Sequence, residues 1–254
     1  MSIKKMKHHW DAFGRNDPMW AILSDPEKKG NRWERVAFFK TGVTEIAALI
    51  AYLESLEVGL ARRRALDFGC GIGRLTQALA DHFDEVHGVD LAPSMIELAN
   101  RYNRRPDKCQ YHLNEDFVLR TFASDTFDLV YSNLTLQHIE PKHSRKYISE
   151  FVRVLATGGV LVFQLPSHPV PIESLKERVK RALPEHLVTF LQRIKNLHKP
   201  LMYMYGINKE EVEDLLRQTG ARVLDVLPDH SAGKEWVSFR YSVLKEGAPR
   251  KRVQ

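Results

Sequence analysis

The chain has 254 residues, 43% of them hydrophobic, and a formal net charge of +6, so it can bury a sizeable core without disulfides or metals. Its two cysteines cannot form a disulfide framework, which favours a reducing, cytoplasmic setting. No apolar run approaches the ~20 residues of a membrane span. The basic N-terminus lacks the apolar stretch of a signal peptide, and the basic residues at both ends are expected to be solvated tails.

Residues 1–41 combine aromatic side chains with charges and two Asp-Pro steps. This composition is too apolar for a disordered tail and predicts short helices docked on the rest of the chain. Residues 42–58 then carry apolar side chains on one helical face, which predicts a longer helix.

The middle of the chain alternates between apolar runs of strand length and helical patterns. Such spacing predicts a doubly wound, mostly parallel, Rossmann-like α/β sheet. Strands are expected at 64–68, 85–90, 109–113, 127–132 and 160–163 and helices at 72–83, 93–104 and 142–155.

Residues 167–205 break this alternation. They open with prolines and continue as a basic helical pattern, which we interpret as a helical insert after the fifth strand. Asn208 and Glu211 have the spacing of a capping box, so a helix is expected to follow. Strands at 221–227 and 236–243 complete a seven-stranded sheet, and the clean alternation of the last one predicts an antiparallel strand.

The turn after the first strand is the most specific feature of the chain. Gly69, Gly71 and Gly73 allow positive φ and carry no β-carbons, so a ligand can approach the backbone. The helix that follows directs free N–H groups to the same place. Asp90 follows the second strand, where a carboxylate can accept hydrogen bonds from both hydroxyls of a ribose. The alternative interpretation is a merely tight turn with Asp90 as a loop acid.

Two other nucleotide motifs do not fit this turn. The dinucleotide pattern is G-x-G-x-x-G, but here the third glycine falls one position early and Arg74 stands where glycine is needed. The triphosphate-binding pattern G-x-x-x-x-G-K-[ST] does not occur in the sequence.

Several segments together resemble the class I S-adenosylmethionine-dependent methyltransferases. Within them, the resemblance is to the ubiquinone/menaquinone-biosynthesis-like, or methyltransferase type 11, subgroup. It covers residues 40–165 well and the remainder loosely. The segments that carry it are 65–73, 88–96, 114–117, 125–130, 133–139 and 154–161.

The resemblance implies S-adenosylmethionine as the cofactor and gives roles to the first two motifs. Asp67, Gly69 and Gly71 would line the methionine and ribose part. Asp90 would hold the ribose hydroxyls, with Leu91 beside it. The resemblance implies no metal site.

The same resemblance gives roles to residues further along the chain. Met95 would pack on the adenine, and Asp116 would meet the adenine amino group with Phe117 beside it. Asn133 and Leu134 would flank the sulfonium end. Met95 and Phe117 could instead be core residues, and Asp116 could cap a turn.

Methyl transfer from a sulfonium requires an acceptor held in line with the methyl group, and orientation alone can supply ~7–11 kcal/mol. A hydroxyl acceptor needs a base more than an amine does. His138 is the first candidate, because it follows the fourth strand at the edge of the sheet where ligands bind; a structural histidine is the alternative. His8, His9, Trp10 and His168 could also reach the site. Tyr203 and Tyr205 could line the acceptor pocket, with an ordinary hydrophobic stripe as the alternative.

We therefore expect residues 42–254 to form a class I methyltransferase domain. Residues 1–41 would form an N-terminal helical cap, and the insert 167–205 would help to roof the acceptor pocket. The expected activity is transfer of a methyl group to a small-molecule acceptor by in-line displacement.

Two alternatives remain open. The basic insert and tails would suit a nucleic-acid (RNA) methyltransferase, but residues 133–136 lack the Asn/Asp-Pro-Pro-Tyr/Phe tetrad that usually accompanies base methylation on amino groups. A cofactor-binding scaffold without turnover is the second alternative. The insert could also touch a membrane surface, although its apolar repeat fits equally well a helix packed on a domain.

Overall fold

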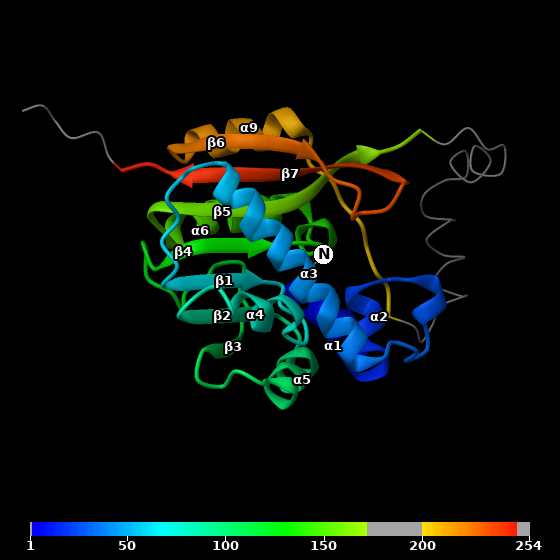
Figure 1. Cartoon of the computed structure of the whole chain (residues 1–254). Coiled ribbons are helices and arrows are strands. Elements are labelled where there is room, and N and C mark those ends of the chain that lie inside the picture. Colours follow the sequence, from blue (N-terminus) through cyan, green and yellow to red (C-terminus); the bar gives the residue numbers. More distant parts are fainter. Residues whose placement is uncertain (1, 172–199, 248–254) are drawn as a thin grey trace, which may run out of the picture.

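The computed structural model describes residues 2–171 and 200–247. At its centre is a seven-stranded sheet in the order β3-β2-β1-β4-β5-β7-β6 (Figure 1). Strands β1 to β5 pair in parallel, whereas β7 is antiparallel to both β5 and β6. The predicted fold class, including the antiparallel last strand, is confirmed. The strands are β1 Arg64–Phe68, β2 Glu85–Asp90, β3 Cys109–Leu113, β4 Phe127–Ser132, β5 Leu155–Pro169, β6 Ala221–Pro228 and β7 Trp236–Lys245.

Helices cover both faces of the sheet. Apolar side chains of α3 and α4 pack with those of β1, β2 and β4 on one face, and α6 and α9 contribute to the core on the other. The helices of the described ranges are α1 Ile3–Asn16, α2 Pro18–Ile22, η1 Pro26–Lys28, α3 Arg35–Ser55, α4 Arg74–Leu79, α5 Pro93–Tyr102, η2 Leu136–His138, α6 Pro141–Val154 and α9 Lys209–Gln218.

Helix α3 is long and apolar enough, by length and composition, to be a candidate membrane span. A core helix passes the same test, and α3 buries Ile46, Leu49, Ile50 and Leu53 against the sheet. We therefore interpret its apolar face as part of the hydrophobic core.

Several predicted boundaries were wrong, and each error has a local cause. Helix α3 begins at Arg35 rather than at residue 42, because the Glu34 carboxylate accepts the N–H of Ala37 at 2.9 Å and caps it. Helix α4 begins only at Arg74, because Gly73 adopts the left-handed region at φ +83°. Strand β5 is longer than the expected 160–163, since it pairs with β7 beyond Leu165.

The predicted capping box at the start of α9 was also wrong. Asn208 makes no side-chain cap hydrogen bond there, and the carboxylate of Glu211 binds Arg145 on α6 instead. The helix itself and its stop at Gly220, with φ +74°, were predicted correctly. Most of the predicted insert 167–205 lies outside the described residues.

Helices α1 and α2 lie beside the carboxyl ends of the parallel strands (Figure 1). Asp11 fixes α1 to the start of α5: its Oδ1 accepts the N–H of Ser94 at 2.9 Å, and its carbonyl accepts the Ser94 hydroxyl at 2.9 Å. Gly14 brings the two helices close, since a β-carbon there would stand 2.2 Å from Ser94 Oγ. The aromatic N-terminal residues thus form docked helices.

Candidate functional site

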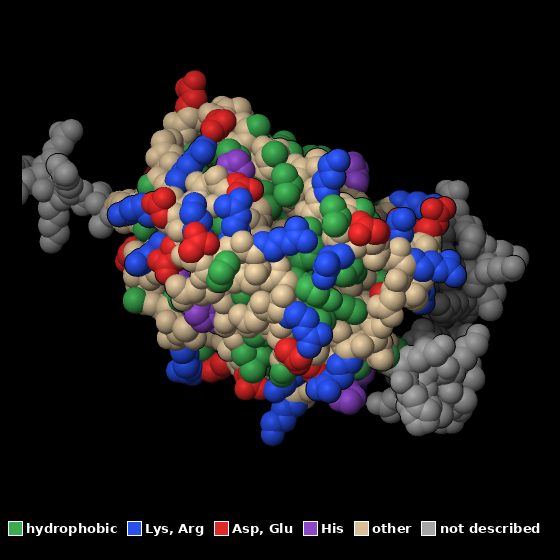
Figure 2. Space-filling model, turned by 60° about the horizontal axis from the view of Figure 1, so that its bottom comes forward, with side chains coloured by type: hydrophobic (Ala, Val, Ile, Leu, Met, Phe, Trp, Pro, Cys, Tyr) green, Lys and Arg blue, Asp and Glu red, His purple; other side chains and the backbone are tan. Residues whose placement is uncertain are grey.

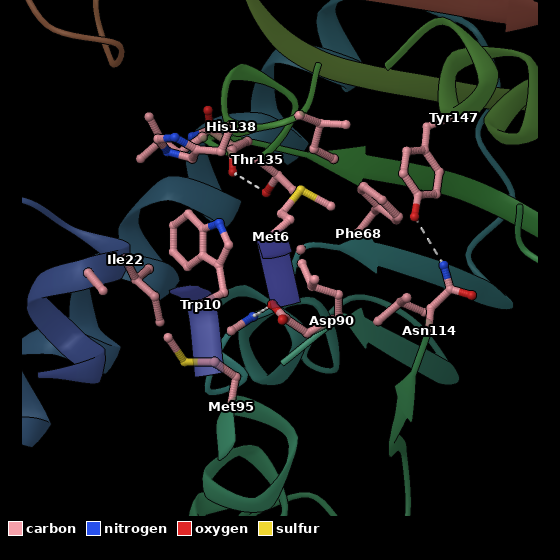
Figure 3. A pocket seen from close by; sticks show the side chains of 18 residues that line it. Met6, Trp10, Ile22, Phe68, Asp90, Met95, Asn114, Thr135, His138 and Tyr147 are labelled. Atoms are coloured by element: carbon pink, nitrogen blue, oxygen red, sulfur yellow. Dashed lines mark hydrogen bonds between the residues drawn. The ribbon is translucent and has the colours of Figure 1, made fainter. Parts of the chain in front are cut away.

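A cavity of about 70 Å³ lies where β1, β2 and β4 end, covered by the N-terminal helices. Figure 3 shows Met6, Trp10 and Ile22 from those helices facing the strand ends. The lining includes Gly69, Gly71, Asp90, Leu91, Met95, Asn133, Leu134 and His138, all expected at the cofactor or catalytic site. The lining also contains Met6, Trp10, Ala21, Ile22, Phe68, Val89, Asn114, Thr135, Ile139 and Tyr147.

The Asp90 carboxylate is turned toward the glycine loop. Its Oδ2 accepts the Gly71 N–H at 3.0 Å and its Oδ1 accepts the Ala92 N–H at 2.9 Å. Burial raises the pKa of Asp90, while these backbone hydrogen bonds favour the charged form. The carboxylate is therefore fixed by the backbone at the edge of the cavity, with further lone pairs for a ligand.

The glycines of the turn are required by close neighbours. Gly69 has φ +79° and Gly71 has φ +52°. A β-carbon on Gly69 would stand 2.1 Å from Thr135 Oγ1, and one on Gly71 would stand 2.5 Å from Ile22 Cδ1. The loop after β4 and helix α2 thus lie directly against the glycine turn.

Asp67 lies beneath this turn and does not line the cavity. It is 1% exposed and accepts a hydrogen bond from Thr76 Oγ1 at 2.6 Å. Burial raises its pKa to about 7. Its place in the structure is thus a support for the turn and the start of α4.

Asn114 and Tyr147 lie together at one side of the cavity, and Met95 lies near Trp10 and Ile22 (Figure 3). Asn114 Nδ2 donates to the Tyr147 hydroxyl at 3.2 Å (Figure 3) and to the Asp116 carbonyl at 2.8 Å. Neither Asn114 nor Tyr147 was singled out from the sequence. Asn114 stood in the segment that carried the resemblance, but Tyr147 lies on α6 and no sequence signal connected it to the site.

Asp116 and Phe117 do not line this cavity. Hydrogen bonding to Arg120 at 2.8 Å lowers the pKa of the Asp116 carboxyl, which is half-exposed. The Phe117 ring stacks on His143 with centroids 3.4 Å apart. Both are next to residues of the lining: the Asp116 carbonyl accepts hydrogen bonds from Asn114 and Tyr147, and the Phe117 ring packs edge-on against Tyr147.

The turn after β4 forms the other end of the cavity. Leu134 has φ +58°, which is uncommon for a residue other than glycine, and the Gln164 Oε1 holds its N–H at 3.2 Å. Asn133 Nδ2 donates to Glu45 Oε1 at 2.7 Å. Glu45 lies on α3 and was not identified from the sequence, because it is 88 residues away from Asn133.

His138 lines the cavity with its ring held on both nitrogens. Nδ1 lies 2.7 Å from the Tyr203 carbonyl, so Nδ1 carries the hydrogen, and Nε2 lies 3.1 Å from the Gln137 amide nitrogen, which donates to it. Burial lowers the pKa of His138 to about 4. In this arrangement His138 is a neutral ring that connects η2 to residues 200–207.

Apart from Trp10, which lines the cavity, the other candidates lie around this connection rather than in the cavity lining. The Tyr205 N–H donates to the Gln137 carbonyl at 2.7 Å, and the Tyr203 and Tyr205 rings stack at 6.4 Å. His9 Nδ1 accepts the Leu201 N–H at 3.4 Å. His8 is exposed, and His168 at the end of β5 hydrogen-bonds its neighbour Ser167.

Comparisons with known proteins agree with this geometry. Residues 66–163 match the model of a methyltransferase domain family. The chain therefore carries a methyltransferase domain, whose bounds enclose the glycine turn, Asp90 and the loop after β4. Its curated relatives are named as methyltransferases, and S-adenosylmethionine-dependent methyltransferases are among the solved structures of similar fold.

Two curated relatives illustrate the range of the match. The malonyl-[acyl-carrier protein] O-methyltransferase of Halorhodospira halophila is 34% identical over 143 residues, 54% of this chain and 45% of the relative. The O-methyltransferase cnsE of Penicillium expansum is 28% identical over 166 residues, 63% of this chain and 52% of the relative. The chain spans about half the length of the curated relatives it matches.

Among solved structures, the fold is similar to that of magnesium protoporphyrin IX methyltransferase from Synechocystis PCC 6803 with S-adenosylmethionine bound. The TM-score is 0.61 at 15% identity, over 96% of this chain and 97% of that one. At this level of identity the similarity establishes the fold alone.

Proposed function

We propose that the protein transfers the methyl group of S-adenosylmethionine to an oxygen atom of a small-molecule acceptor. The observation that carries the proposal is the Asp90 carboxylate, fixed on the Gly71 N–H at the edge of a cavity. A carboxylate at this place can accept both hydroxyls of a ribose. Gly69 and Gly71 line the cavity, so a ligand can contact their backbone, while Thr135 and Ile22 pack where β-carbons would stand.

The residues present fit this cofactor. Met95 offers an apolar surface in the lining, and Asn114 and Tyr147 offer polar groups on the other side of Asp90. At the other end the buried Oδ1 of Asn133 has no partner within the described part of the chain, so it is available to a ligand donor. When bound, the cofactor supplies an electrophilic methyl group on a good, neutral leaving group.

The protein contributes orientation and the exclusion of water. Met6, Trp10 and Ile22 cover the cavity from the N-terminal side, and Leu134 and Thr135 fix the loop beside Gly69. Holding an acceptor in line with the methyl group can supply about 7–11 kcal/mol. Burial lowers the pKa of His138 to about 4, which makes it a weak base, and Gln137 and the Tyr203 carbonyl engage its two ring nitrogens; we therefore assign it to positioning the loop rather than to taking a proton.

An oxygen acceptor is supported by the names of similar proteins. The relatives from Halorhodospira halophila and Penicillium expansum are both named O-methyltransferases, and the proteins from Coxiella burnetii that match over 114 residues are named ubiquinone biosynthesis O-methyltransferases. The acceptor can therefore be sought first among small carboxylic acids and phenols.

The test has two stages. Titration calorimetry with S-adenosylmethionine should show binding, and Asp90→Ala should weaken it by about 100-fold, because two hydrogen bonds to a charged group are lost. Asp107→Asn, a change at an exposed acid, is the matched control and should bind normally. Mass spectrometry of a metabolite extract incubated with deuterium-labelled cofactor should then reveal the acceptor. Unchanged binding by Asp90→Ala would contradict the proposal.

The nucleic-acid alternative would be favoured by one continuous basic area on the surface. On the face seen in Figure 2, Lys and Arg side chains are interspersed with acidic and hydrophobic ones. The groove between α3 and α5 is lined by Arg35, Lys40, Arg74, Arg101, Arg104 and Arg105; of these, Arg101 pairs with Glu97, Arg105 with Asp81 and Arg74 with Glu45. RNA affinity that falls steeply with salt would support the alternative. The scaffold alternative predicts binding without labelled products.

A further inference from the structure

Glu45 lies outside the methyltransferase family match yet its carboxylate binds three side chains beside the cavity. Its Oε1 accepts the Tyr131 hydroxyl at 2.9 Å and Asn133 Nδ2 at 2.7 Å. Its Oε2 accepts Arg74 Nη2 at 2.8 Å. Arg74 is 3% exposed and is held further by Thr41 at 3.3 Å. Glu45 is therefore fixed on both oxygens.

This fixed carboxylate determines the orientation of the Asn133 amide. A carboxylate has acceptors only, so the group of Asn133 that faces it must be the donor Nδ2. The amide Oδ1 is then presented away from Glu45. That oxygen is buried and has no hydrogen-bond partner within residues 2–171 and 200–247, although a buried amide oxygen is normally satisfied.

The position of Asn133 indicates which part of the ligand meets this oxygen. Asn133 follows β4, Asp90 ends β2, and β1 with its glycine turn lies between them. Two strand spacings separate such residues by about 10 Å. With the ribose on Asp90, the far end of the cavity takes the amino-acid part of the cofactor. That part carries one strong donor, a primary ammonium.

We propose that Glu45 is a positioning residue that turns the Asn133 amide so that its Oδ1 accepts a hydrogen bond from the ammonium group of the cofactor's methionine part. The Glu45 charge behind the amide makes Oδ1 a stronger acceptor. The inference rests on the proposed cofactor but not on the identity of the methyl acceptor.

The experiment compares two ligands that differ only in this part. S-adenosylhomocysteine carries the ammonium, whereas 5′-methylthioadenosine keeps the adenosine and thioether without the amino acid. Asn133→Ala removes the acceptor and leaves the Glu45–Arg74 pair in place. Glu45→Gln lets the amide turn over, because a glutamine can donate to Oδ1. Glu54→Gln, at an exposed acid on the same helix, is the matched control.

Calorimetry should show S-adenosylhomocysteine binding weakened about 10-fold or more by Asn133→Ala and by Glu45→Gln, as expected for a lost hydrogen bond to a charged group. Binding of 5′-methylthioadenosine should stay within about 2-fold of the wild type in both variants. Glu54→Gln should change neither affinity. The ratio of the two affinities separates positioning from a general loss of structure.

Three results would overturn the inference: equal weakening of both ligands by Asn133→Ala, normal binding of S-adenosylhomocysteine by that variant, or normal binding of it by Glu45→Gln. If Glu45→Gln unfolds, Glu45→Asp replaces it: this variant keeps a charge for the buried Arg74 but is too short to hold Asn133 as well, so it should weaken S-adenosylhomocysteine binding and leave 5′-methylthioadenosine binding unchanged, and normal binding of both ligands would overturn the inference. Because binding is measured, a failure to find any methyl acceptor would refute the proposed function and leave this result intact. A wild type that binds neither ligand would refute both.

Discussion

His138 shows how burial determines the charge of a residue at the cavity. Its pKa is lowered to about 4 from an ordinary 6.5, so the unfolded chain binds more protons than the folded one between these values. The resulting stability is fully present above about pH 6.5 and is lost as the pH falls toward 4, by up to roughly 3 kcal/mol. His138→Gln should remove this part of the pH dependence.

Urea unfolding at pH 7.5 and pH 5 measures the effect. The wild type should lose more stability between these two values than His138→Gln. His87 and His112, whose pKa values burial also lowers, contribute equally to both proteins and cancel in the difference. Equal losses in the two proteins would show that His138 is not buried as a neutral ring.

Helices α1 and α5 are connected by the hydrogen bonds between Asp11 and Ser94. Asp11 caps α5 through the Ser94 N–H, and loss of such a cap costs about 1 kcal/mol. Asp11→Ala should therefore speed hydrogen exchange in residues 3–16 by about 5-fold. Arg15→Gln removes only the exposed ion pair with Asp11 and should leave exchange unchanged. Identical exchange in the two variants would contradict this role of Asp11.

The elements themselves were largely predictable, since short, mostly apolar runs of strand length alternate with helical patterns along the chain. The bounds of β1, β2, β3 and β4 agree with those expected. The predictions that failed depended on partners far away in the sequence. Strand β5 is longer than expected because it pairs with β7, and Glu211 forms an ion pair with Arg145 instead of capping its helix. The site residues show the same dependence on distant partners. Asp90 was predictable from its spacing after the glycine turn, whereas Glu45 was not, because its partner Asn133 is 88 residues away.

At the scale of the whole molecule, the cavity is smaller than its proposed ligand. Small-molecule sites usually measure about 300–1,000 Å³, whereas this one has about 70 Å³ under α1 and α2. We therefore predict that binding displaces these helices and that contacts to the ligand then hold them. Saturation at 100 times the dissociation constant should stabilise the fold by about 2.7 kcal/mol, or roughly 5–10 °C in a protein of this size.

Thermal unfolding with and without S-adenosylhomocysteine measures the shift, and hydrogen exchange of residues 3–22 locates it. Exchange in this segment should slow on binding by more than in β6 at the far edge of the sheet, which serves as the internal control. A raised midpoint with unchanged exchange in α1 and α2 would mean that the ligand enters without displacing them.

The contact of Ile22 with the glycine turn has a kinetic consequence. Because this side chain would meet a β-carbon on Gly71 at 2.5 Å, whatever lies on that glycine is sealed in while α2 stays docked. Under the proposed function, we expect the spent cofactor to depart only when the helix retracts. We then predict that this retraction limits the rate of each cycle, so that good and poor acceptors turn over at similar maximal speed and accumulated by-product inhibits strongly.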